Sequence, residues 1–121
     1  MPAEIVLTGL KNCDTTRAAC KWLDQHKLNY RFADVRTNGL DQHWIRDAWN
    51  QLGNGILNKK STSWRALSPD DQAGANTDEG AQALLLENPT LLKRPVLTVG
   101  TNFLAAGFSE QNYQQLFQHL K

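Results

Sequence analysis

The feature that most constrains this chain is a cysteine in a short polar run between an apolar segment and a helical pattern. The run Gly9–Arg17 has the sequence GLKNCDTTR. Ile5-Val6-Leu7 before it is typical of a buried strand, and Ala18–Leu23 after it is typical of a helix. Cys13 is therefore expected at a strand-to-helix turn, beside unpaired N–H groups and the positive end of the helix dipole. That setting favours the thiolate, which is the nucleophilic form of cysteine.

Charged neighbours modify this expectation for Cys13. Lys11 and Arg17 are cations that favour the thiolate, whereas the adjacent Asp14 carboxylate disfavours it. Asp14 is also expected to be the N-cap of the helix. The alternative for Cys13 is a small, inert cysteine buried in a turn. The helix N-terminus and the two cations favour the reactive thiol.

The second cysteine is expected to be structural. Cys20 falls on or beside the apolar stripe Ala18, Ala19, Trp22 and Leu23 of a helix over residues 15–26, so its thiol should be buried and slow to react. About two helical turns, or roughly 10 Å, separate it from Cys13. The Cα atoms of a disulfide lie within about 7 Å of each other. No disulfide is therefore expected, which fits a reducing compartment.

The remaining pattern predicts an α/β fold. Residues 29–35 alternate like a strand and complete a β-α-β unit. Residues 95–99 and 103–106 predict a β-hairpin, followed by a helix that Ser109 caps and whose apolar face extends to Leu120. The expected architecture is a four-stranded mixed sheet in the order β-α-β … β-β-α, with helices on both faces.

A helical segment interrupts this sheet. Residues 41–93 carry helix patterns and no strand signal, and a turn at Thr37-Asn38-Gly39 precedes them. Strands flank the segment on both sides. We therefore expect one domain, residues 1–121, with a helical insertion at about 41–93.

Composition excludes several classes of protein. The 121 residues include 13 basic and 12 acidic side chains, and this balance gives no indication of direct nucleic-acid binding. No apolar run approaches the roughly 20 residues that span a bilayer, and the N-terminus lacks the pattern of a signal peptide. The histidines His26, His43 and His119 are scattered, so no metal site is expected. A cytoplasmic monomer is the expectation.

Three stretches carry a family resemblance. They are Lys11–Thr15 after the first strand, Leu57–Arg65, and Leu92–Val96. Their order and spacing along the chain match those of a known family. Together they resemble the YffB-like branch of the arsenate reductase/Spx family, over nearly the whole chain. The resemblance implies a thioredoxin-like fold with a helical insertion and a thiol-based reductase ancestry.

The resemblance also implies a site around Cys13. In thioredoxin-like proteins the proline at the place of Pro95 is cis and faces the cysteine. Arg94 would then present its guanidinium beside the thiol, where it lowers the thiol pKa and binds oxyanions; otherwise it is a solvated surface arginine. The backbone donors of the cysteine loop suit an anion or a glutathione carboxylate. The expected substrate- or anion-binding residues are Lys11, Asn12, Asp14, Thr15, Thr16, Arg94 and Pro95.

Two departures from the family pattern shape the functional expectation. Dithiol enzymes and Spx regulators carry a Cys-x-x-Cys motif. In this chain Thr16 stands at the position of the second cysteine. A monothiol mechanism remains, in which Cys13 attacks and external glutathione resolves the adduct.

The second departure concerns the three arginines that arsenate reductases of this family place around the cysteine. They correspond here to Asn58, Arg94 and Gly107, so one of three is retained. Lys59 and Arg65 are possible substitutes for the missing charge, although a lysine does not replace a bidentate arginine.

Three functions follow as hypotheses. The first is a glutathione-dependent thiol oxidoreductase related to arsenate reductase, with no bound cofactor, glutathione as co-substrate and low arsenate activity. The second is an Spx-like transcriptional regulator that binds RNA polymerase without catalysis. The third is a thioredoxin-fold binding scaffold in which Cys13 is vestigial.

Overall fold

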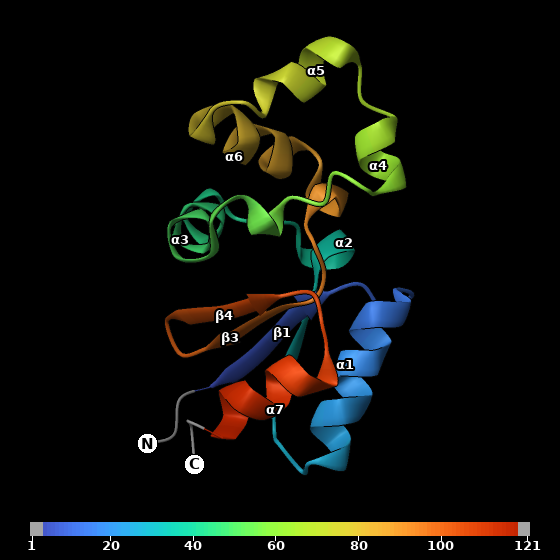
Figure 1. The fold of residues 1–121 in the computed structure, drawn as a ribbon, viewed down its shortest axis with the longest axis vertical. Coiled ribbons are helices and arrows are strands. Elements are labelled where there is room, and N and C mark those ends of the chain that lie inside the picture. The colour runs from blue at the N-terminus through green and yellow to red at the C-terminus, as the bar shows by residue number, and fades with distance from the viewer. Residues whose placement is uncertain (1–3, 119–121) are drawn as a thin grey trace. The chain divides into compact units, whose positions relative to one another are not determined.

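The computed structural model describes residues 4–118 and divides the chain into two compact units (Figure 1). One unit comprises the residues up to Asp34 together with those from Arg94 onwards, and the other is Val35–Lys93. The first unit contains β1 (Ile5–Gly9), α1 (Asp14–Gln25), β2 (Arg31–Asp34), β3 (Val96–Val99), β4 (Asn102–Ala106) and α7 (Glu110–Gln118). The second contains α2 (Val35–Asn38), α3 (Gln42–Leu52), the 3-10 helix η1 (Gly53–Ile56), α4 (Thr62–Arg65), α5 (Pro69–Gly74), α6 (Asp78–Glu87) and the 3-10 helix η2 (Pro89–Leu91).

The first unit is built on a four-stranded mixed sheet in the order β2-β1-β3-β4. β1 and β2 are parallel, and the β1–β3 and β3–β4 pairs are antiparallel. The predicted α/β fold class is therefore confirmed. Thr8 lies opposite Val96, so the end of β1 is next to the start of β3. This register places the Cys13 turn, which follows β1, and the Arg94-Pro95 segment, which precedes β3, at the same end of these two central strands.

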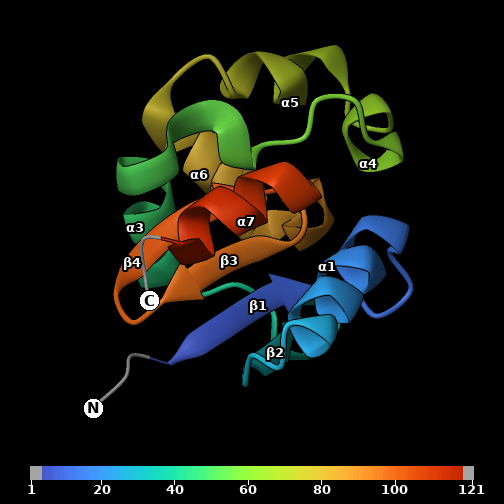
Figure 2. The same cartoon turned by 60° about the horizontal axis from the view of Figure 1, so that its bottom comes forward.

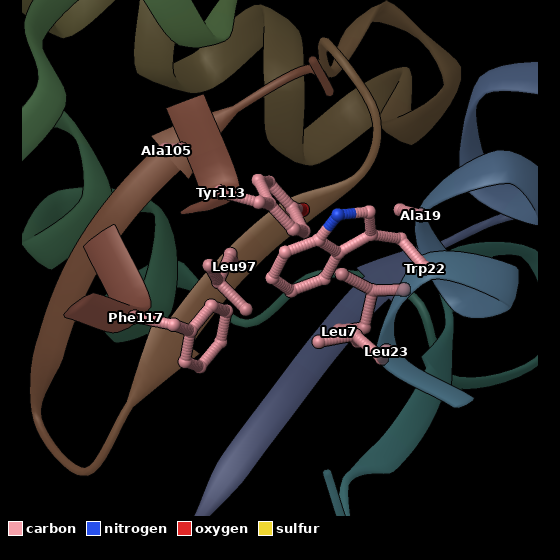
Figure 3. Packing of buried hydrophobic residues seen from close by; sticks show 8 residues of the cluster. All are labelled: Leu7, Ala19, Trp22, Leu23, Leu97, Ala105, Tyr113 and Phe117. Atoms are coloured by element: carbon pink, nitrogen blue, oxygen red, sulfur yellow. The ribbon is translucent and has the colours of Figure 1, made fainter. Parts of the chain in front are cut away.

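Helices α1 and α7 cover the same face of this sheet (Figure 2). Trp22 from α1 and Tyr113 from α7 meet edge to face, with ring centroids 5.6 Å apart (Figure 3). Around them a buried cluster combines both helices with β1, β3 and β4. Its members are Leu7, Ala19, Trp22, Leu23, Leu97, Ala105, Tyr113 and Phe117.

Two expectations about these helices need correction. Within the first unit both helices lie on one face, whereas helices on both faces were expected, because the inward residues of β1, β3 and β4 join a single core with α1 and α7. On α1, Ala18 is exposed and Thr16 is buried instead. The buried stripe starts at Thr16 and continues through Ala19 to Leu23, a helical spacing that a search for apolar residues alone does not find. The expected apolar residue Leu120 lies outside the described residues.

The strand expected over residues 29–35 is shorter in the structure. β2 covers Arg31–Asp34, and Val35 begins the one-turn helix α2, which Gly39 N–H closes by donating to the Val35 carbonyl at 2.8 Å. The expected turn at residues 37–39 is therefore the end of that helix. Val35 is 1% exposed. The helical turn that begins at Val35 ends the strand one residue earlier than the alternating pattern predicted.

The second unit is helical, as the patterns of residues 41–93 predicted. Asp41 accepts hydrogen bonds from the N–H groups of His43 and Trp44 at the start of α3. Ser61, Ser68 and Thr77 cap α4, α5 and α6 in the same way. One extended contact was not predicted: Leu57 pairs with Leu92 in an isolated antiparallel bridge.

Gly9 at the end of β1 is predicted to be sensitive to substitution. A Cβ there would lie 2.6 Å from Thr16 Oγ1 and 2.8 Å from Thr16 Cγ2. Gly9→Ala should therefore destabilise the protein by about 1–3 kcal/mol, measured by urea unfolding. Thr16→Ala in the same chain should recover most of the loss, because it removes both clashing atoms. Gly74→Ala is the control, since open space surrounds Gly74. Equal losses for both glycines would contradict the contact.

Candidate functional site

Cys13 is the N-cap residue of α1. Its backbone is extended, with φ −94° and ψ 123°. Its N–H donates to the Leu10 carbonyl at 3.1 Å, and its carbonyl accepts the first helical hydrogen bond, from Arg17 N–H, at 2.9 Å. The expected N-cap, Asp14, is instead the first helical residue. The half-buried thiol is thereby held at the positive end of the twelve-residue helix.

The pKa of the Cys13 thiol is lowered below its ordinary value. Burial is the largest single effect and acts to raise the pKa. Hydrogen bonds from the Thr16 hydroxyl and from the N–H groups of Thr16 and Thr15, together with the charge of Arg94, outweigh burial. Cys13 is thus a thiol whose surroundings favour the thiolate, as its place at a helix start predicted.

The cation that acts on the sulfur is Arg94, not the cations beside it in sequence. Arg17 forms an ion pair with Asp14 on the helix surface, so each charge offsets the other. Lys11 and Asn12 are exposed in the turn before the helix. Thr15 is exposed as well and contributes its N–H.

The Arg94-Pro95 segment has two features that the resemblance implied, a cis proline and an arginine whose charge acts on the cysteine. The Arg94–Pro95 peptide bond is cis. Pro95 is buried, its carbonyl accepts from Gly107 N–H at 2.9 Å, and Arg94 is half-buried. The charge of Arg94 lowers the pKa of Cys13. The structure therefore brings together Cys13, Thr15, Thr16, Arg94 and Pro95 within the first unit.

Cys20 occupies a different environment on α1. It is half-buried and packs against the core cluster of the first unit. Burial and a hydrogen bond with Cys20, with Asp24 nearby, raise the pKa of the Tyr30 hydroxyl. Both cysteines are free thiols. The unbroken helix between them supports the argument that they do not pair.

The three additional residues considered for anion binding belong to the second unit, where each has a structural setting. Asn58 Oδ1 accepts from Lys60 N–H at 3.1 Å, which makes a side-chain-closed turn. Lys59 Nζ lies 5.6 Å from the centroid of the Trp64 ring. Arg65 is exposed in the last turn of α4.

Among residues 4–118, no group of three or more His, Cys, Asp or Glu side chains is placed to hold a metal ion. No helix in this part of the chain has the length and apolar character needed to cross a bilayer.

The sequence interpretation missed the part that Gly9 and Thr16 play at this site. Thr16 is 1% exposed and packs on Gly9. The signal was available in the spacing: Thr16 is three residues before the buried Ala19, and a glycine ends the preceding strand. A polar residue that falls in the buried stripe of a helix, three residues after a cysteine, is the pattern that identifies Thr16.

Comparisons with known proteins agree on a family and on the fold. The model of the ArsC family matches residues 9–116. An uncharacterised protein of Haemophilus influenzae is 42% identical over 93% of this chain and 98% of its own. The solved structure of a protein named YffB is 36% identical, with a TM-score of 0.84, and covers 92% of this chain and 96% of its own.

Two further relatives bear on function. The solution structure of an arsenate reductase-related protein from Brucella melitensis is 32% identical, with a TM-score of 0.73 and 95% of each chain covered. The global transcriptional regulator Spx 2 of Bacillus cereus is 22% identical over 92% of this chain and 85% of its own.

The two thiols should differ in alkylation rate. The lowered pKa of Cys13 means that its thiolate persists at a pH below the ordinary thiol range, whereas Cys20 packs against the core. Iodoacetamide labelling of the folded protein, located by mass spectrometry, should modify Cys13 first. The rate of Cys13 labelling should rise with pH, and the midpoint of that rise should lie at a lower pH in the folded protein than in the urea-unfolded chain. Equal rates for both thiols in the folded protein would contradict this assignment.

Proposed function

The chain belongs to the ArsC family, and on that premise we propose that it is a monothiol oxidoreductase with Cys13 as nucleophile and glutathione as co-substrate. The single observation that carries this proposal is the favoured Cys13 thiolate at the start of α1, with Thr16 where a dithiol site has its second cysteine. The other free thiol, Cys20, lies about two turns, or roughly 10 Å, along the same helix. Resolution must then come from outside the chain.

The proposed reaction has two thiol–disulfide exchanges. In the first, the Cys13 thiolate attacks the glutathionyl sulfur of a mixed disulfide, forms a Cys13–glutathione disulfide and releases the substrate as its thiolate. In the second, a glutathione thiolate attacks the glutathionyl sulfur, releases the Cys13 thiolate and leaves as oxidised glutathione. The net reaction converts one mixed disulfide and one glutathione thiolate into the substrate thiolate and oxidised glutathione, and it regenerates the Cys13 thiolate.

The proposed binding group for the anionic end of the substrate is Arg94 with the loop from Lys11 to Thr15. Arg94 offers a planar fork that suits carboxylates and oxyanions. Asn58 and Gly107 occupy the places of the other two family arginines. We therefore expect weak activity on arsenate and better activity on adducts whose negative charge is a carboxylate. The chemistry requires a reduced glutathione pool, such as that of the cytoplasm.

Oxidised glutathione is expected to form a mixed disulfide at Cys13. Intact mass spectrometry after incubation should show one glutathione on the unmodified chain and on Cys20→Ser, and none on Cys13→Ser. The helix between the two cysteines prevents an internal bridge. A loss of two hydrogens without a glutathione adduct would show that α1 opens and that Cys20 resolves Cys13.

Arg94 is expected to serve the thiolate and the incoming anion. Arg94→Ala should raise the Cys13 pKa, by no more than about one unit because Arg94 is partly exposed. It should also weaken glutathione binding. Arg94→Lys keeps the charge and loses the fork, so binding should fall more than the pKa rises. Thiolate absorbance and calorimetry measure the two effects, with Arg36→Ala in the second unit as the control. If Arg94→Ala changes neither, Arg94 has no part in the site.

A second candidate function rests on the similarity to Spx 2, whose name describes a global transcriptional regulator. In this reading the chain binds RNA polymerase and performs no catalysis. Thr16 argues against a redox-controlled version, because no cysteine pair is present there. Size-exclusion chromatography with purified bacterial RNA polymerase core enzyme tests it. Co-elution that Cys13→Ser leaves unchanged, with no glutathione turnover, would replace the oxidoreductase proposal.

A further inference from the structure

Gly107 follows β4 with a backbone conformation that few other residues adopt. Its φ is 86°, in the left-handed region that an L side chain disfavours. Gly107 is also buried, and its N–H donates to the Pro95 carbonyl at 2.9 Å. The positive φ and the buried hydrogen bond together make glycine the residue that suits this position.

The register of the sheet shows which segment this hydrogen bond holds. Thr8 of β1 lies opposite Val96 of β3, and Val96 lies opposite Ala106 of β4. One residue beyond this row, the Gly107 N–H meets the Pro95 carbonyl. Two facing residues of an antiparallel pair can exchange two backbone hydrogen bonds, but a proline has no N–H to donate. The bond from Gly107 is therefore the one that this pair can form.

The core of the first unit holds the other side of Gly107. Phe108 is half-buried, and its ring meets the Tyr113 ring edge to face, with centroids 4.7 Å apart. Tyr113 is fully buried and packs in turn against Trp22 (Figure 3). Gly107 is therefore fixed between a ring in the core and the Pro95 carbonyl. A side chain on Gly107 would strain its φ, and relief of that strain would move one of these two contacts.

We propose that Gly107 is a positioning residue whose N–H holds the Pro95 carbonyl and thereby sets where the Arg94 charge lies relative to the Cys13 sulfur. Arg94 directly precedes Pro95, so a shift of Pro95 carries the Arg94 backbone with it. Gly107 touches neither the thiol nor a substrate in this role. The inference deepens the proposed function and rests on it only in that Cys13 is the reacting thiol.

The cation near the sulfur can be measured without a substrate. Iodoacetate and iodoacetamide alkylate the same thiolate, but only iodoacetate is negatively charged. The ratio of their rate constants therefore reports the positive charge near Cys13, and differences in the thiol pKa cancel. A Cys20→Ser chain leaves one thiol to react. Arg94→Ala in that chain should lower the ratio by about twofold to fivefold, the size expected for one partly exposed ion pair.

Three changes at Gly107 separate its φ from its N–H group. Gly107→Ala strains the positive φ and should lower the ratio, as Arg94→Ala does. Gly107→Asn keeps the N–H and tolerates a positive φ better, so it should keep most of the ratio. Replacement of Gly107 by glycolic acid turns the N–H into an ester oxygen and adds no side chain, so it should lower the ratio without strain. The ester carries the test if the alanine variant does not fold.

Gly100 provides a matched control for Gly107. Its φ is also positive, at 62°, and its N–H also donates to a backbone carbonyl at 2.9 Å, that of Glu4. Gly100 follows the last residue of β3, whereas the Arg94-Pro95 segment precedes the first. Gly100→Ala should therefore lower the urea midpoint of unfolding, as Gly107→Ala does, and leave the alkylation ratio unchanged.

A double-mutant cycle tests whether Gly107 acts through Arg94. Gly107→Ala should lower the ratio no further in an Arg94→Ala chain, because the charge that it displaces is then absent. A further fall in the double variant would overturn the proposal, since the effect would reach Cys13 by another route. An unchanged ratio in Arg94→Ala would overturn it as well.

The remaining outcomes also decide the role of Gly107. An unchanged ratio in folded Gly107→Ala, or in the glycolic acid variant, would reject it. A fall in Gly100→Ala equal to that in Gly107→Ala would mean that any strained turn in the hairpin has the same effect, and a fall in Gly107→Asn equal to that in Gly107→Ala would remove the argument from φ. Either result contradicts the proposal.

The alkylation rates keep this proposal separate from the proposed function, because they need no glutathione and no turnover. If the ratios change as expected but the wild-type chain does not reduce glutathionylated substrates, the oxidoreductase proposal fails and the role of Gly107 stands. If the wild type turns over and the ratios do not change, the role of Gly107 fails and the oxidoreductase proposal stands.

Discussion

The packing of Thr16 onto Gly9 is the interaction on which the site depends. It joins the end of β1 to the first turn of α1. A side chain at Gly9 would separate the strand from the helix, and the N–H groups of Thr15 and Thr16 would no longer be held beside the Cys13 sulfur. The local geometry of Cys13 therefore depends on one strand-to-helix contact.

The electrostatics of Cys13 result from opposing effects. Burial alone would favour the neutral thiol, and it is the largest single effect. Oriented backbone donors, the Thr16 hydroxyl and the Arg94 charge reverse that preference together. The β1–β3 register supplies the last of these, because Thr8 opposite Val96 brings the Arg94-Pro95 segment to the edge of the sheet where β1 ends. No single neighbour of Cys13 in sequence accounts for the result.

The same residues support the proposed monothiol mechanism. Thr16 fills the position of a second cysteine with a side chain that is buried and cannot form a disulfide. Cys20 packs against the core farther along an unbroken helix. The basic residues of the second unit have structural settings of their own: Lys59 lies over Trp64, and Arg65 ends a short helix. Within the first unit, Arg94 is the cation that acts on the thiol.

The sequence by itself determined the fold class, most of the elements and the place of Cys13 at a helix start. Hydrophobic periodicity predicted the helices, because this signal is local, and the side chains of Asp41, Ser68 and Thr77 cap three of them in the structure. A cysteine after a buried strand and before a helix predicted a perturbed thiol for the same reason. The family motifs, and not the periodicity, placed Arg94 and the cis proline near it.

Only the tertiary structure decided that Thr16, and not Asp14 or Arg17, acts on the sulfur. Asp14 and Arg17 appear equivalent to other charged neighbours in sequence, but they pair with each other on the helix surface. Thr16 appears to be an ordinary polar residue of the first turn, but its contact with Gly9 buries it. Burial and electrostatic interaction depend on distances in space, and strand register and helix packing set those distances.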